Sequence, residues 1–162
     1  MMNGIDTTAV IQVAIVVRDL DATVKAWTEF LGIGPSELMV SGTLAEAGTE
    51  YRGAATGARC RIAFFDFGQC RLELLEPIDA PSVWSDHLMK RGEGVQHIAF
   101  AVRGMGNGIE EFDRLGIRLA QRGDNGRYAY FDSEARLGTM IELLEVGPED
   151  GPVDEDTAGN PI

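Results

Sequence analysis

The feature that most constrains this sequence is an internal repeat that marks the start and the end of two halves. Residues 11–18 (IQVAIVVR) match residues 96–103 (QHIAFAVR) at an offset of 85, and residues 72–76 (LELLE) match residues 141–145 (IELLE) at an offset of 69. Such a repeat determines the architecture, because a unit this small cannot bury its apolar faces alone. The chain is therefore predicted to contain two similar, fused units, the first with about 16 extra residues (85 − 69).

Each half has the same predicted order of elements, namely a strand, a helix and three further strands. Alternating side chains predict strands, and apolar residues three or four positions apart predict a helix after the first strand of each half. Helices are predicted at residues 20–31, 82–91 and 107–115, and strands at 9–17, 38–41, 60–67, 70–76, 95–102, 117–121, 127–132 and 139–146. The predicted fold class is α+β, with two fused βαβββ modules.

The predicted boundaries divide the chain into two modules, a connector and a tail. The modules cover residues 8–77 and 95–146, and residues 78–94 form a connector helix between them. The acidic residues 147–162, rich in Gly and Pro, are predicted to be disordered. The extra residues of the first module fall in 34–57, where most of the sequence has no clear period. This segment is either a lid or substrate wall or a tolerated insertion, and the sequence leaves both open.

Composition and charge restrict the classes of partner. The formal net charge of −12 argues against nucleic acid, whose phosphates such a protein repels. No apolar run reaches the length of a membrane span and the first residues lack a secretory pattern, so a cytoplasmic protein is expected. Cys60 and Cys70 are poorly placed for a disulfide and are expected to be reduced. A small molecule is therefore the expected partner.

Four polar residues occupy matched positions of the two halves. Gln12 and His97 lie on the first strands, and Glu73 and Glu142 lie on the last strands, all within apolar sequence. An unpaired amide or carboxylate there costs on the order of a few kcal/mol, so a partner must satisfy them. Brought together by the relation between the halves, they form a four-ligand site for a divalent ion whose charge balances the carboxylates. The alternative is a polar pocket without metal.

With these residues, the chain resembles the vicinal oxygen chelate superfamily, which includes glyoxalase I, methylmalonyl-CoA epimerase, bleomycin and fosfomycin resistance proteins and extradiol dioxygenases. The resemblance covers most of residues 8–146 and is carried by VRDLD (17–21), FLGI (30–33), LELLEP (72–77), GVQHIAF (94–100) and IEL (141–143). It is strongest to methylmalonyl-CoA epimerases over residues 87–102. The resemblance implies paired βαβββ modules whose mixed sheets curl around a concave metal site, and a homodimer.

The resemblance places the family's metal ligands on Gln12, Glu73, His97 and Glu142. Epimerases usually have His at the first position, but a Gln, Glu, His, Glu set is similar to that of the zinc form of glyoxalase I. The implied cofactor is a divalent ion such as Zn, Co, Ni, Mn or Mg. The acidic residue that bacterial epimerases are thought to use as a second base falls near Arg61, where no carboxylate is present. A dioxygenase is disfavoured because non-haem iron sites need two histidines.

The expected function is that of a metal-dependent isomerase, epimerase or lyase that abstracts a proton next to a carbonyl of a small acyl or thioester-type substrate. Glu142 is the expected catalytic base, with Glu73 as a ligand and reprotonating partner. The alternatives are a metal-free binding or resistance protein of the same fold and a metal-free enzyme.

Residues outside the four-residue set are assigned more loosely. Five arginines of the second half either contact a CoA or glutathione substrate or are simply solvated charges. They are Arg103, Arg114, Arg118, Arg122 and Arg127. Four aromatic residues are candidates for lining a pocket, namely Trp27, Tyr128, Tyr130 and Phe131. For Trp27, packing in the core is the default expectation.

Overall fold

The computed structural model describes residues 5, 7 and 9–147. These residues form one ten-stranded sheet of order β2-β5-β6-β1-β7-β10-β9-β8-β3-β4. The strands are β1 (Val10–Val16), β2 (Glu37–Val40), β3 (Glu50–Tyr51), β4 (Ala54–Ala55), β5 (Cys60–Asp66), β6 (Arg71–Pro77), β7 (Gly94–Val102), β8 (Leu119–Gly123), β9 (Tyr128–Phe131) and β10 (Met140–Glu145). The helices are α1 (Leu20–Leu31), α2 (Leu44–Ala47), α3 (Val83–Arg91), α4 (Met105–Arg114) and α5 (Glu134–Leu137), with a 3-10 turn η1 (Asp124–Gly126).

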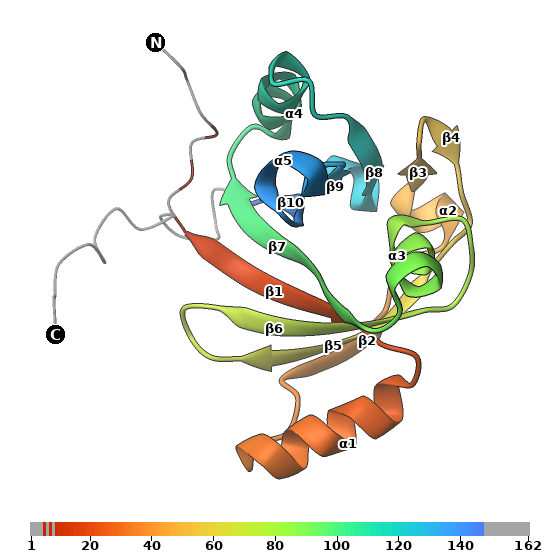
Figure 1. Ribbon diagram of the computed structural model, residues 1–162, viewed down its shortest axis with the longest axis vertical. Helices are drawn as coiled ribbons and strands as arrows, with labels where there is room; N and C mark the ends of the chain where they lie inside the picture. The colour runs from red at the N-terminus through yellow and green to blue at the C-terminus, as the bar shows by residue number, and fades with distance from the viewer. Residues whose placement is uncertain (1–4, 6, 8, 148–162) are drawn as a thin grey trace, which may run out of the picture.

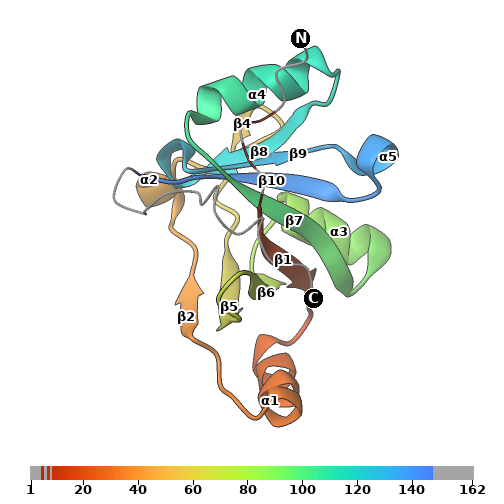
Figure 2. The same ribbon diagram turned by 90° about the vertical axis from the view of Figure 1, so that its left-hand side faces the viewer.

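The sheet is curled and mixed, as predicted. Figure 1 shows it bending around the interior of the molecule, and Figures 1 and 2 place α1 and α4 at opposite ends. The pairs β1/β6 and β7/β10 are parallel, whereas β1 and β7 run antiparallel to each other at the centre. The predicted α+β class is therefore confirmed. The predicted module boundaries at 8–77 and 95–146 stay predictions, because the sheet is continuous across them.

The register shows that the sequence repeat is a repeat of structure. Gln12 is opposite Arg71 in β1/β6, and His97 is opposite Met140 in β7/β10. Both correspondences reproduce the offsets of 85 and 69 residues. The central strands and their parallel neighbours are thus related by an approximate twofold axis between β1 and β7, which places matched residues near one another.

Local signals explain the helices that cover the sheet. Asp19 caps α1 by accepting a hydrogen bond from the backbone N–H of Ala22 at 2.9 Å, and Gly32 ends it with φ of 71°. The apolar stripe of α1 packs with Val17, Phe65 and Leu74. The predicted helix at 20–31 agrees with the structure. The helix predicted at 107–115 begins two residues earlier, at Met105.

The segment 34–57 departs from the prediction of a largely irregular loop. β2 pairs with β5 at one edge of the sheet, and the chain then crosses to the other half, where β3 pairs with β8. The elements α2, β3 and β4 were not predicted, because two to four residues are too few to show a period. Their conformation follows from tertiary pairing, and the segment contributes a wall to the cavity described below.

Several further expectations concern the rest of the chain. Cys60 and Cys70 are free, as predicted. Among the described helices, none has the length and hydropathy needed to span a bilayer. Apart from Gly147, the tail predicted to be disordered lies outside the described residues.

Candidate metal centre

The strands β6, β1, β7 and β10 carry the matched polar residues in two rows across the sheet. The register gives one row with Glu73, Ala14, His97 and Met140, and a second row with Arg71, Gln12, Ala99 and Glu142. In each row a fully buried alanine stands between two of the matched polar residues. Side chains this small leave room for the longer polar side chains of the neighbouring strands to converge.

All four residues singled out by the sequence come together. Glu73, His97 and Glu142 offer ligand atoms that lie within 4.8 Å of one another. His97 Nε2 is 3.3 Å from Glu73 Oε2 and 3.0 Å from Glu142 Oε2. Gln12 Nε2 donates to Glu73 Oε2 at 2.5 Å. Their exposed fractions are between 0% and 5%, so the whole cluster is shielded from water.

Gln96 fixes the orientation of the His97 ring. Its Nε2 donates to the carbonyl oxygen of Val83 at 2.9 Å, so its Oε1 faces His97 Nδ1, also at 2.9 Å. Because this amide oxygen can only accept, Nδ1 must carry the proton. In the neutral ring Nε2 is then an acceptor directed at two carboxylates. Histidines that bind a metal typically donate their other ring N–H to an acceptor that is itself held in place, as Gln96 is held by the backbone of Val83.

This arrangement fits a cation. Among the described residues, His97 Nε2 and Glu142 Oε2 are buried and have no hydrogen-bond partner. Acceptors that point at each other repel unless a proton or a positive ion lies between them. A half-turn of the Gln12 amide presents its oxygen in place of the nitrogen, which supplies a fourth oxygen or nitrogen ligand. One imidazole, two carboxylates and one amide oxygen suit a borderline divalent ion such as zinc.

The same geometry shifts the pKa of two groups. Burial raises the pKa of the Glu73 carboxyl, and attraction to His97 and the hydrogen bond from Gln12 only partly oppose this. For His97, burial acts to lower the pKa, but attraction to Glu142 and Glu73 outweighs burial and raises it to about 9. Without a metal, a proton on His97 therefore offsets part of the negative charge of the cluster at neutral pH.

A cavity of about 290 Å³ opens beside the cluster. Gln12, Glu73 and Glu142 lie in its wall, and Ser41 and Thr49 of the crossing segment close another side. Its remaining lining is mostly apolar and aromatic and includes Met39, Ile62, Phe64, Leu75, Trp84, Tyr128, Tyr130 and Leu144. The cavity is therefore sized for a small molecule that contacts the four-residue cluster.

Comparison with known proteins then identifies the family. Residues 11–131 match the model of the Glyoxalase/Bleomycin resistance protein/Dioxygenase superfamily. The chain belongs to this superfamily. It is also 32% identical over 92 residues to YqjC, an uncharacterised protein of Bacillus subtilis (strain 168), covering 54% of this chain and 66% of that protein. The chain thus spans slightly less than two thirds of this relative.

Solved structures with the superfamily fold include methylmalonyl-CoA epimerases. The Mycobacterium tuberculosis epimerase superposes with a TM-score of 0.64 at 23% identity, covering 92% of this chain and 94% of that one. A variant of the Streptomyces coelicolor epimerase, in complex with 2-nitronate-propionyl-CoA, gives 0.66 at 25% identity, covering 91% and 100%. The similarity therefore extends over nearly the whole fold and both halves.

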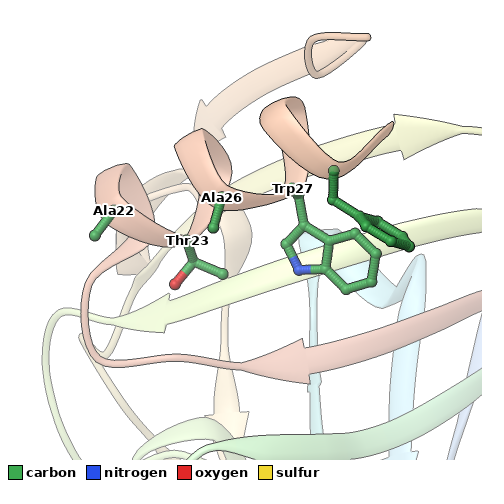
Figure 3. A pocket seen from close by; sticks show the side chains of 5 residues that line it. Ala22, Thr23, Ala26 and Trp27 are labelled. Atoms are coloured by element: carbon green, nitrogen blue, oxygen red, sulfur yellow. The ribbon is translucent and has the colours of Figure 1, made fainter. Parts of the chain in front are cut away.

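The looser predictions for aromatic residues have mixed outcomes. Of the aromatic candidates, Tyr128 and Tyr130 line the cavity, but Phe131 is buried in another cluster. Trp27, for which core packing is the default expectation, packs partly buried against the cluster around Phe65 and Leu74, and it also lines a separate surface pocket with Ala22 and Ala26 (Figure 3). Alternation along β9 explains the error for Phe131, because neighbouring residues of a strand face opposite sides.

For the second-half arginines, the structure supports the alternative of solvated surface charges over contact with the cavity. None of the five second-half arginines lies among the described residues of the cavity wall. Arg114 pairs with Glu111 and Arg122 pairs with Glu50 on the surface. Arg61 pairs with Asp21 and Glu76, away from the cavity. Sequence reasoning missed the cavity residue Arg71, although its spacing of two from Glu73 on one strand indicated a shared face.

Proposed function

We propose that this protein is a metal-dependent isomerase, epimerase or lyase that removes a proton from a carbon next to a carbonyl group. The observation that carries the proposal is the buried cluster of Glu73, His97 and Glu142, in which acceptor atoms face one another beside a cavity. A divalent ion held by these residues and Gln12 would supply a Lewis acid for the carbonyl oxygen of the substrate.

The hydrogen bonds of the two carboxylates differ, and this difference supports separate roles. Without a metal, Glu73 Oε2 accepts from Gln12 Nε2, which holds Glu73 beside the proposed ion position. Glu142 Oε2 faces only His97 Nε2, at 3.0 Å, and no other described residue donates to it, so it is free of a donor once His97 gives up its proton to bind an ion. A catalytic base needs a free lone pair within reach of the proton that it takes. Glu142 is therefore the proposed base, and Glu73 the proposed fixed ligand and reprotonating partner.

The surroundings of Glu142 suit this proton transfer. Glu142 takes the proton from the α-carbon as the electron pair of that C–H bond moves toward the carbonyl oxygen, and the proton then returns to carbon. The apolar cavity wall keeps bulk water away from the carbanionic species and strengthens charge interactions inside. The superposed epimerases support chemistry of this class, since one of them is solved with a CoA ester. Thioesters are accordingly the first substrates to test.

The test combines metal analysis with proton exchange. Protein purified without chelator is expected to carry about one equivalent of divalent ion. It is also expected to exchange the α-proton of a 2-substituted acyl thioester or a hemithioacetal with deuterium, followed by NMR. Glu142→Gln should retain the metal and lower exchange at least about 100-fold. Glu110→Gln, at an exposed position on α4, is the matched control and should change neither.

Each other outcome contradicts a defined part of the proposal. Unchanged exchange in Glu142→Gln would refute the role of Glu142. Exchange that persists after the ion is removed by a chelator would indicate a metal-free enzyme. Neither metal nor exchange with any of these substrates would favour a binding protein that uses the same cavity.

A further inference from the structure

Arg71 is the cationic side chain of the cavity. Among the described lining residues, no other lysine, arginine or histidine is present. Arg71 precedes Glu73 by two residues on β6, so both side chains lie on one face, roughly 7 Å apart along the strand. It is also the register partner of Gln12 on β1. Arg71 therefore lines the same cavity as Gln12, Glu73 and Glu142 of the proposed metal centre.

The contacts of Arg71 hold its guanidinium group but leave part of it unused. The guanidinium carbon lies 3.7 Å from the centre of the Phe64 ring, and one terminal nitrogen donates to Glu37 Oε2 at 2.9 Å. Its Nε is buried and no described residue accepts from it. A buried donor without a partner costs about 1–3 kcal/mol, so a ligand that accepts from this N–H recovers that cost.

The position of Arg71 breaks the symmetry of the two halves. Its counterpart in the second half is Met140, which is buried and uncharged. The four-residue cluster does not need this cation, because the charges of its carboxylates are balanced by the proposed ion. Asp124, an acidic lining residue outside the cluster, is exposed on η1, where water screens it. Among the described lining residues, Arg71 is thus the one cation, and Glu37 is its ion-pair partner.

We propose that Arg71 binds a carboxylate of the substrate, which makes the substrate a short acid with a carbonyl group a few carbon atoms from its carboxylate. The guanidinium fork matches a planar carboxylate, which can accept two parallel hydrogen bonds. The carbonyl end then points to the metal centre and the acid end to Arg71. This inference rests on the proposed function, which places the carbonyl oxygen at the metal centre.

The test compares 4-oxopentanoate with its methyl ester, which keeps the ketone and lacks the charge. Binding to zinc-loaded protein is measured by calorimetry or NMR titration. The wild-type protein should prefer the acid by about tenfold or more, the factor expected for one charge-assisted contact. Arg71→Met should abolish this preference. Arg122→Met, which removes a surface arginine paired with Glu50, should leave the preference unchanged.

Glu37→Gln separates recognition from a structural role. Glu37 competes with a ligand for the Arg71 guanidinium group, so its neutralisation should strengthen binding of the acid and leave binding of the ester unchanged. If Arg71 only supports the fold through this ion pair, both Arg71→Met and Glu37→Gln should weaken the two ligands equally. Equal weakening of both ligands in the two variants would overturn the proposal. So would an equal preference for the acid in Arg71→Met and wild type, or a wild type that does not bind the acid.

Zinc uptake is measured first in wild type and in each variant. Failure of the wild type to bind zinc refutes the proposed function. The preference for acid over ester is measured in zinc-loaded and metal-free protein alike and tests Arg71 alone. Arg71→Met should bind zinc as the wild type does, because Arg71 is not one of the proposed ligands.

Discussion

The metal-free protein is predicted to lose stability as the pH rises through the range in which His97 loses its proton. The pKa of His97 is about 9 in the folded protein, whereas an unfolded histidine has a pKa of about 6.5. Between these values the folded state binds more protons than the unfolded state, so the free energy of unfolding falls with rising pH. The raised pKa of Glu73 acts in the same direction.

The size of the effect follows from the shift of His97. One pKa unit corresponds to about 1.4 kcal/mol, so a difference of roughly 2.5 units contributes about 3 kcal/mol to the free energy of unfolding. This contribution is fully present below about pH 6.5 and is lost as the pH passes about 9. A small domain has a total stability of about 5–15 kcal/mol, so the change is readily measured.

Urea unfolding in the presence of a chelator, at about pH 6 and about pH 9.5, measures this change. The variant His97→Gln is the control and should lose the part of the pH dependence that comes from the titrating ring. Saturating zinc should reverse the trend, since the ion binds the deprotonated ring. A wild-type stability that stays constant or rises between these two pH values would refute the described interaction of His97 with Glu73 and Glu142.

Two further predictions test the space around the cluster. Ala99→Leu adds volume between Gln12 and Glu142 and should lower the affinity for zinc at least about tenfold. Zinc titration measures this affinity, and an unchanged affinity would show that the ion does not use this space. Gly123→Ala places a methyl carbon 2.6 Å from the ring carbon Cζ of Tyr128 and should cost about 1–3 kcal/mol in urea unfolding. Gly57→Ala, which meets nothing within 4 Å, should cost little, and equal costs would contradict the steric argument.

Much of the site could be predicted from the sequence because its determinants are local. A strand alternates its side chains with period two, so Gln12 and Ala14 share one face of β1 and His97 and Ala99 share one face of β7. The two offsets of the repeat then fix which residues correspond across the halves. With parallel pairing inside each half, Glu73 and Glu142 necessarily fall on the same face as these residues.

The hydrogen-bonding role of Gln96 shows where local reasoning stops. Gln96 neighbours His97 in the sequence, but only the carbonyl of Val83, brought close by the packing of α3, turns its amide so that it fixes the ring. The crossing segment is a second case, because β3 is only two residues long and forms through pairing with β8. Neither feature has a signal in a window of neighbouring residues.

By itself, the sequence determined the repeated halves, the fold class and the four polar residues that meet, since these depend on periodicity and matched spacing. The tertiary structure alone decided that Ser41 and Thr49 close the cavity and that Arg71, rather than an arginine of the second half, supplies its cation. The physical reason is that a cavity is defined by the distances among side chains from several strands. The curvature of the sheet and the path of the crossing segment set those distances, and neither is encoded in a local pattern.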